Sequence, residues 1–333
     1  MKAVALISGG LDSILSAILI RSQGIKVIGL YFKTPFASQR ENLEKIFLKQ
    51  KLALLKAGIK INSVVLGKEY LKIISKPRYG YGANLNPCID CRILMLNKAR
   101  LMMHRLGAKF IITGEVLGQR PMSQHKQALE LIEKEARLSG LILRPLSARA
   151  MPESLPEREG WVKRNNLFAI QGRSRRTQIA LAEKFNIKYF FTPAGGCLLT
   201  DRTFTQRLND LLQHGEFNLH NIALLKIGRH FRLAPKTKLI VGRNEEENKK
   251  LLKLAFANDY LFTPYFNISG PTALLRGNLK EELIDLANSI VCRYCDRNGK
   301  SAIRIIYKKV KEKKRKSQET SPIEENKMSI FRV

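Results

Sequence analysis

Six residues near the start of the chain have the types and the spacing of a phosphate-binding loop. The stretch Ser8-Gly9-Gly10-Leu11-Asp12-Ser13 follows an apolar run that predicts a strand over residues 2–7, and it precedes a helical pattern over residues 11–22. Glycines allow a tight turn whose N–H groups face a phosphate, serines add hydroxyl donors, and the helix adds the positive end of its dipole. Asp12 fits such a site if its carboxylate holds Mg2+. A plain strand-to-helix turn capped by Asp or Ser is the alternative, and the position directly after the first strand favours the phosphate loop.

The five cysteines are a second group of residues that could do chemistry. Two pairs have Cys-x-x-Cys spacing, Cys88/Cys91 and Cys292/Cys295, and Cys197 follows two glycines. In a chain that we expect in the cytoplasm, this pattern indicates redox, sulfur or metal chemistry and not a disulfide framework. Cys292 and Cys295 have no histidine or further pair nearby, so they indicate zinc only weakly. Surface or semi-buried thiols near a helix end, a zinc site shared by two chains and a sulfur relay to Cys88 stay open for them.

The glycine loop resembles the PP-loop of the ATP pyrophosphatase superfamily, whose pattern is Ser-Gly-Gly-x-Asp-Ser. The five defining residues are all present: Ser8, Gly9, Gly10, Asp12 and Ser13. The resemblance implies that the chain binds ATP, cleaves it between the α and β phosphates, and adenylates an oxygen of its substrate. It also implies an adenosine pocket at the end of the second strand, at Tyr31 and Phe32. Aromatic residues that close a core at a strand end explain those two positions equally well.

The cysteines indicate which members of that superfamily are most similar. The segment Asn86-Pro87-Cys88-Ile89-Asp90-Cys91 resembles the Asn-Pro-Cys-x-x-Cys segment of the tRNA 2-thiouridine synthases. The segment Pro193–Thr200, which contains Cys197, resembles part of the proteins related to the tRNA 4-thiouridine synthases. The resemblance implies an ATP-dependent tRNA sulfurtransferase. The alternatives are a PP-loop enzyme that amidates or ligates an amine to RNA, and a non-catalytic protein that binds ATP and RNA.

Two sulfur mechanisms fit Cys88, Cys91 and Cys197. In the first, these thiols bind three irons of a [4Fe-4S] cluster, whose fourth iron carries sulfide. In the second, one cysteine bears a persulfide that attacks the activated base, and another releases the sulfur by forming a disulfide. We favour the cluster. The sulfur donor is accordingly sulfide or a persulfide carrier, and either Asp90 or Glu115 could hydrogen-bond the incoming base.

Strands alternating with helices must position these residues. Over residues 1 to about 150 the apolar runs alternate with helical patterns such as residues 42–57 and 89–106, which is typical of a doubly wound parallel sheet. The resemblance adds a fold like that of the adenine nucleotide α-hydrolases, over residues 1–210. Thr113 and Gly114 end a strand, where open α/β sheets bind their ligands, so we expect them to line the ATP site.

The last third of the chain predicts a smaller α+β domain. Residues 215–307 resemble the RNA-binding NFACT-R module, on the segments Val241–Asn248 and Gly270–Thr272. Within this region, residues 222–231 predict a strand, and residues 308–333 predict a basic, flexible tail. We expect a cluster of cations to follow the phosphate backbone of RNA, although each one alone would also suit a solvated surface. These residues are Arg229, Arg232, Lys236, Lys238 and Arg243.

The charge of the chain indicates its partner. Its 333 residues contain 59 Lys and Arg against 28 Asp and Glu, a formal charge of +31. Such a surplus repels itself, whereas neutralising phosphates releases counterions and drives association. We therefore expect a nucleic acid, specifically tRNA, and no membrane partner. A generally basic set of proteins would explain the charge without RNA. The sequence leaves the oligomeric state open, a homodimer included.

Overall fold

The computed structural model describes residues 1–38, 41–191, 197–278 and 280–333. The chain divides into two compact units, Met1–Asp201 and Arg202–Val333, each with its own core. The predicted break between residues 210 and 215 therefore lies too late in the chain, since the second unit already begins with the helix α8 (Arg202–Gln213). No helix of the described residues combines the length and apolar character needed to cross a membrane.

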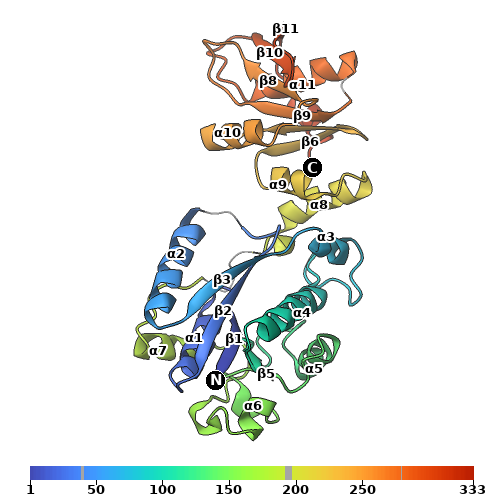
Figure 1. Cartoon of the computed structure of the whole chain (residues 1–333). Coiled ribbons are helices and arrows are strands. Elements are labelled where there is room, and N and C mark those ends of the chain that lie inside the picture. The colour runs from blue at the N-terminus through green and yellow to red at the C-terminus, as the bar shows by residue number, and fades with distance from the viewer. Residues whose placement is uncertain (39–40, 192–196, 279) are drawn as a thin grey trace. The chain divides into compact units, whose positions relative to one another are not determined.

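The first unit is built on a five-stranded parallel sheet with the order β3-β2-β1-β4-β5. Its strands are β1 (Lys2–Leu6), β2 (Lys26–Lys33), β3 (Lys60–Val65), β4 (Phe110–Ile112) and β5 (Ile142–Leu143). Its main helices are α1 (Leu11–Arg21), α2 (Glu41–Lys56), α3 (Lys68–Ser75), α4 (Cys88–Arg105), α5 (Lys126–Glu135), α6 (Leu155–Arg158) and α7 (Arg176–Lys184). Figure 1 shows α1 and α7 on one face of the sheet and α4 and α5 on the other.

The central strand shows why both faces must be covered. Side chains alternate along a strand, so Ala3, Ala5 and Ile7 share a core cluster with α1. Val4 and Leu6 point the other way, into a cluster with α4 and α5. A strand that is apolar on both faces is typical of a parallel sheet between two helical layers. The predicted doubly wound fold is confirmed.

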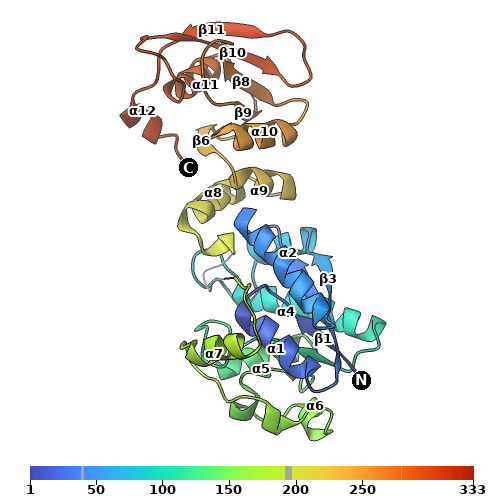
Figure 2. The same ribbon diagram turned by 90° about the vertical axis from the view of Figure 1, so that its left-hand side faces the viewer.

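The second unit contains a six-stranded antiparallel sheet with the order β11-β10-β8-β9-β7-β6. Its strands are β6 (Arg229–Ala234), β7 (Thr237–Val241), β8 (Tyr260–Pro264), β9 (Ala273–Gly277), β10 (Ile303–Lys309) and β11 (Lys316–Thr320). The helices after α8 are α9 (Leu219–Leu225), α10 (Glu245–Lys253), α11 (Glu281–Arg293) and α12 (Glu325–Ser329). The α+β prediction for this region is confirmed, and the hairpin of β10 and β11 can be followed in Figure 2.

Two predictions for this unit were wrong. Residues 222–231 do not form one strand, because α9 ends at Leu225 and β6 begins only at Arg229. Residues 308–333 are not a tail: they complete β10 and form β11 and α12. The many lysines of this segment made it resemble a disordered tail in the sequence. β11 pairs with β10 along its whole length, and Met328 of α12 is fully buried in the core.

The same core contains the second cysteine pair. Cys292 and Cys295 are buried among the side chains of β6, β7, β9 and α11. Cys292 Sγ lies 3.2 Å from the carbonyl oxygen of Thr320, and Cys295 Sγ lies 3.3 Å from the carbonyl oxygen of Val291. The pair lies at the end of a helix, as one interpretation predicted, but it is buried in the core and not at the surface.

Candidate active site and nucleic-acid interface

The glycine loop connects β1 to α1 at the carboxyl edge of the first sheet. Gly9 has a φ of +83°, a left-handed conformation that glycine adopts at no steric cost. The Ser13 hydroxyl donates to the carbonyl oxygen of Gly10 at 2.8 Å and accepts from the backbone N–H of Ser8 at 3.1 Å. The Ser8 hydroxyl accepts from the N–H of Gly10 at 3.3 Å. The two serines thus fix the turn that presents its amides to a ligand.

Asp12 lies in the first turn of α1 with half of its carboxylate uncommitted. Its Oδ2 accepts a hydrogen bond from Gln119 at 3.2 Å. Its Oδ1 is buried and has no hydrogen-bond partner among the described residues. Burial raises the pKa of Asp12, although Gln119, Arg175 and Arg120 oppose that rise. A buried carboxylate oxygen without a donor is costly unless a ligand compensates it, and Mg2+ bound by one carboxylate and substrate phosphates would do so.

The strand end at Gly114 touches the backbone of the loop. A Cβ on Gly114 would lie 2.4 Å from the backbone nitrogen of Ser13 and 2.6 Å from the carbonyl carbon of Asp12. The φ of Gly114 is not left-handed, so the backbone conformation does not require glycine there. The close approach to the loop does. The Thr113 hydroxyl points to another partner and donates to Glu115 Oε2 at 3.0 Å. The structure brings Gly114 to the loop, whereas Thr113 contributes to a buried ion-pair network.

The carboxylate of Glu115 is part of that network and is 1% exposed. The Nε atoms of Arg92 and Arg144 each lie 3.0 Å from its oxygens. Burial alone would raise the pKa of Glu115, but these two arginines hold it below its ordinary value. Asp90 is also committed, because it accepts from the backbone N–H groups of Arg78 and Tyr79. Both acids that were expected to meet the base thus stabilise the fold in this structure.

Three thiols gather at the same edge of the sheet. Cys88 is the first residue of α4, Cys91 lies one turn later, and Cys197 pairs with Ala37 in an isolated bridge. The buried hydroxyl of Tyr70, on α3, donates to Cys91 Sγ at 3.0 Å. Residues 193–196 of the predicted motif lie outside the described residues.

The pKa values of these thiols show that they lie close to one another. Burial raises the pKa of Cys88 and Cys197, and raises that of Cys91 to about 12. Both Cys197 and Cys88 raise the pKa of Cys91 further, and Cys88 raises that of Cys197. The three sulfur atoms are therefore within electrostatic range of each other.

The thiols do not form a ready metal site. Within the described parts of the chain, no three His, Cys, Asp or Glu side chains are spaced to hold a metal ion. Each thiol of a [4Fe-4S] cluster binds a different iron, so the cluster at Cys88, Cys91 and Cys197 stays a prediction. Asp12 is different, because its uncommitted oxygen fits Mg2+ held jointly with a phosphate ligand.

One arginine links the loop to the thiols. Arg120 follows Gln119 in the loop after β4. Its positive charge lowers the pKa of Asp12, and it also lowers those of Cys88 and Cys197 against the larger effect of burial. The Arg120 guanidinium is thus within electrostatic range of both groups.

The two aromatic residues at the end of β2 have different neighbours. The ring centroid of Tyr31 lies 4.0 Å from that of Phe47, on the face covered by α1. Phe32 packs into the opposite cluster, beside α4. Side chains alternate along a strand, so the structure places Tyr31 and Phe32 on opposite faces of the sheet.

The predicted RNA-binding cations fall into separate groups. Arg232 and Lys238 both bind the Asp210 carboxylate, with N–O distances of 2.6 and 2.5 Å. Arg243 pairs with Glu247, and Lys236 is exposed in the turn between β6 and β7. Arg229 lies elsewhere, at the wall of a pocket of about 1070 Å3.

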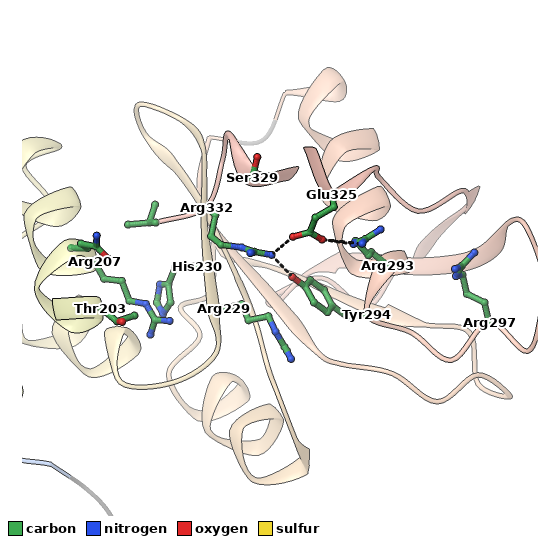
Figure 3. Close-up of a pocket in the computed structure, with 12 residues that line it drawn as sticks. Thr203, Arg207, Arg229, His230, Arg293, Tyr294, Arg297, Glu325, Ser329 and Arg332 are labelled. Carbon is green, nitrogen blue, oxygen red and sulfur yellow. Dashed lines mark hydrogen bonds and ion pairs between the residues drawn. The ribbon is translucent and has the colours of Figure 1, made fainter. Parts of the chain in front are cut away.

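That pocket is lined by arginines from distant parts of the second unit. Its charged lining residues are Arg207, Arg229, Arg293, Arg297, Arg332 and Glu325. Figure 3 shows Glu325 between Arg293 and Arg332, which it binds at 2.9 and 3.0 Å. The guanidinium of Arg229 stacks on the Tyr294 ring at 4.4 Å from its centroid.

Comparison with known proteins agrees with this division. Residues 1–151 match the family model described as thiamine biosynthesis protein (ThiI). Residues 228–332 match the NFACT protein RNA binding domain. The chain joins a ThiI-like PP-loop domain to an NFACT RNA-binding domain. The resemblance that the Ser8–Ser13 loop and the C-terminal segments predicted is thereby confirmed.

Individual relatives cover the ThiI-like part. A probable tRNA sulfurtransferase of Lysinibacillus sphaericus is 29% identical over 44% of this chain and 34% of its own length. A tRNA-specific 2-thiouridylase of Sulfurimonas denitrificans is 28% identical over 35% of each chain. A solved 4-thiouridine synthetase–RNA complex with bound ATP is 26% identical over 40% of this chain and 34% of that one, with a TM-score of 0.34. The chain thus spans about a third of the length of the curated relatives it matches.

The NFACT match includes most of the arginine pocket. Arg229, Arg293, Arg297 and Arg332 fall inside residues 228–332, and Arg207 precedes them on α8. Of these, Arg229 alone was predicted from the sequence. Arg293 and Arg297 are close in the chain, but they meet Arg207, Arg229 and Arg332 only when α8, β6, α11 and the C-terminal segment fold together, so no local pattern could have revealed the pocket. The predicted flexibility of residues 308–333 also hid Glu325 and Arg332.

Proposed function

We propose that this protein is an ATP-dependent tRNA sulfurtransferase that forms AMP and pyrophosphate. It would adenylate a carbonyl oxygen of a uridine and replace that oxygen with sulfur, giving 4-thiouridine or 2-thiouridine. The proposal follows from the ThiI-like domain, which implies ATP binding, and from the three thiols next to the loop. The names of the two curated relatives given above, both of which concern tRNA thiolation, support the same acceptor.

One arrangement carries the proposal: the loop begins α1 and Cys88 begins α4 at the same edge of the parallel sheet, and Arg120 acts electrostatically on Asp12, Cys88 and Cys197. A carbonyl oxygen is a poor leaving group until it is adenylated, and the adenylate must then meet a sulfur nucleophile before water does. An activating loop and a set of thiols around one guanidinium meet that requirement. A cation there would also stabilise the negative charge that develops on the departing phosphates.

The residues of the chain have separate roles in this reaction. The amides of Gly9 and Gly10 and the hydroxyls of Ser8 and Ser13 would hold the phosphates, while Asp12 would hold Mg2+, which neutralises phosphate charge when bound. The uridine oxygen attacks the α-phosphorus and pyrophosphate leaves. Sulfur then attacks the base carbon, and AMP leaves with the original oxygen.

The source of the sulfur divides the proposal into two forms. In the persulfide form, the terminal sulfur of one cysteine persulfide bonds to the base carbon. A second cysteine then forms a disulfide with the first, and a thiol reductant restores both. In the cluster form, Cys88, Cys91 and Cys197 would each bind one iron of a [4Fe-4S] cluster, whose fourth iron would carry sulfide. Anaerobic purification followed by iron analysis separates the two, since about four irons per chain would establish the cluster.

The function is tested by incubating the protein with ATP, Mg2+, a sulfur source and an unmodified tRNA transcript. Nucleoside mass spectrometry should detect a thiouridine, with AMP formed in equal amount. Cys88→Ala, Cys91→Ala and Cys197→Ala should each abolish the thiouridine, whereas the matched control Cys295→Ala, in the other core, should not. Unchanged thiouridine in all three variants would disprove sulfur transfer through these thiols.

The same assay separates the alternatives. Incorporation of ammonia or an amine, with no requirement for sulfur, would indicate an amidating or ligating enzyme. Binding of ATP and tRNA without any AMP would indicate a non-catalytic protein. In cells, unchanged tRNA thionucleosides in an Asp12→Ala strain would also reject the sulfurtransferase.

A further inference from the structure

The arginine pocket of the second unit has the composition of a phosphate site. Five of its lining residues are arginines, and lysines are absent from the described lining although lysines outnumber arginines in the chain. The guanidinium group is a planar fork of donors that matches two phosphate oxygens at once, whereas the lysine ammonium is a point charge. The selection of arginine therefore indicates directional recognition of an oxyanion.

The arginines are held in place before any ligand arrives. Glu325 binds Arg293 through Oε2 and Arg332 through Oε1, and the Nη2 of Arg332 also donates to the Tyr294 hydroxyl at 3.4 Å. Arg229 lies over the ring of Tyr294, so a single aromatic residue orients two of the cations. Figure 3 shows this arrangement around Tyr294. Side chains that are already ordered lose less entropy when they bind a ligand.

The charge of the pocket does not depend on histidine. His230 also lines it, but burial lowers its pKa well below the ordinary value, and its Nε2 interacts with the carbonyl oxygen of Ile227 at 2.8 Å. Glu325 is the one carboxylate side chain in the described lining. The five arginines outnumber the acidic groups of the described lining and focus a positive potential in a concave surface, which attracts an anionic ligand.

We propose that this pocket binds phosphate groups of RNA and is the place where the NFACT domain holds the RNA acceptor. The proposal deepens the proposed function and rests on it for the identity of the RNA. RNA is favoured over an acidic protein because the surrounding domain matches an RNA-binding family. Hydroxyl and amide side chains at the rim, from Thr203, Gln206 and Ser329, are also groups that contact phosphate and sugar.

The test measures the affinity of the full chain for an unmodified tRNA transcript by fluorescence anisotropy at several salt concentrations. The variant is Arg229→Gln/Arg297→Gln. These arginines donate to the carbonyl oxygens of Gly242 and Lys300, so their removal leaves both Glu325 pairs intact. The matched control is Lys249→Gln/Lys253→Gln, which removes the same charge from the exposed face of α10.

The pocket variant should bind RNA about tenfold more weakly near 0.15 M salt, and the slope of log K against log salt should become shallower by about 1.4 to 1.8 for two lost phosphate contacts. The control should stay within about twofold of the wild type. Equal losses in both variants would overturn the proposal, because binding would then follow net charge alone. Unchanged RNA binding in the pocket variant would also overturn it, even if inorganic phosphate binds the wild type.

Additional measurements separate RNA binding at the pocket from protein binding, from catalysis and from a folding defect. If the substitutions weaken binding of a glutamate-rich peptide but leave RNA binding intact, the pocket serves an acidic protein and the proposal fails. If the salt slope changes as expected while no thiouridine forms, the pocket proposal stands and the sulfurtransferase fails. Thermal unfolding of both double variants should match the wild type, so that a folding defect in the pocket variant alone would count against the proposal.

Discussion

The close approach of Gly114 to the phosphate loop gives the sharpest test of the ATP site. In a Gly114→Ala chain the new methyl carbon would lie 2.4 Å from the Ser13 nitrogen and 2.6 Å from the Asp12 carbonyl carbon. Non-bonded carbon atoms favour separations of about 3.5–4.0 Å, so the loop and the strand end must separate by about 1 Å. Both neighbours are backbone atoms, and no side-chain rotation relieves the clash.

Two effects of different size follow from that displacement. Overpacking of this kind costs about 1–3 kcal/mol of folding stability. A misplacement of about 1 Å at a reacting group lowers the rate by about 100-fold, because the phosphate loop must hold its ligand in line for attack. We therefore expect AMP formation to fall far more than thermal stability.

Pyrophosphate release measures the rate, and calorimetry measures both ATP affinity and unfolding. Gly10→Ala is the comparison, since its Cβ would meet the Ser8 hydroxyl at 3.4 Å and its backbone is extended. That variant should change the free energy of unfolding by no more than about 0.5 kcal/mol. A Gly114→Ala protein with wild-type ATP affinity and rate would refute the close-approach reasoning.

Three further predictions follow from other contacts. Asp12→Asn should abolish Mg2+-dependent AMP formation without lowering the melting temperature, because the Asp12 oxygen Oδ1 has no hydrogen-bond partner among the described residues; a lower melting temperature would contradict this. Glu115→Gln should destabilise the first unit by about 1–3 kcal/mol in urea unfolding, since the buried Arg144 would lose one of its two carboxylate partners and keep Glu133. The folded chain holds the pKa of Glu115 below its ordinary value. In the wild type, the stabilisation from its ion pairs should therefore be complete above that ordinary pKa and be lost as the pH falls through the lowered pKa of the folded chain. Deleting residues 310–333 should unfold the second unit, as seen by circular dichroism, and an unchanged melting curve would show that β11 and α12 are dispensable.

The sequence predicted the first unit well because its signals are local. Apolar runs, a glycine loop and helical periodicity gave the doubly wound sheet, and the loop lies where the first strand meets α1. Contacts between segments that are distant in the chain could not be predicted. The fit of Gly114 against the backbone of Ser13 and the reach of Arg120 to both groups depend on how β4 lies beside β1.

The second unit was harder because its strongest compositional signal misled. A run of lysines predicted disorder after residue 308, yet the polar residues of β11 pair with β10 along the backbone, and Met328 is buried in the core. Among the predicted RNA-binding cations, Arg232 and Lys238 were indistinguishable in sequence from Arg229. Only folding shows that Asp210 and Glu216 pair with the first two while Arg229 lines the pocket.

The distribution of carboxylates explains where the surplus charge of the chain must lie. Even if each of the 28 acidic residues paired with one cation, 31 cations would stay unneutralised. Several acids are already used inside the units, where Glu115 and Asp210 each bind two cations. The surplus must therefore be exposed, and residues 308–316, with seven basic side chains and one acidic one, are its densest stretch in the second unit. This hairpin lies at the sheet edge opposite β6, which carries Arg229, so an RNA that reaches both should give the wild type a larger total salt slope than the share removed by Arg229→Gln/Arg297→Gln.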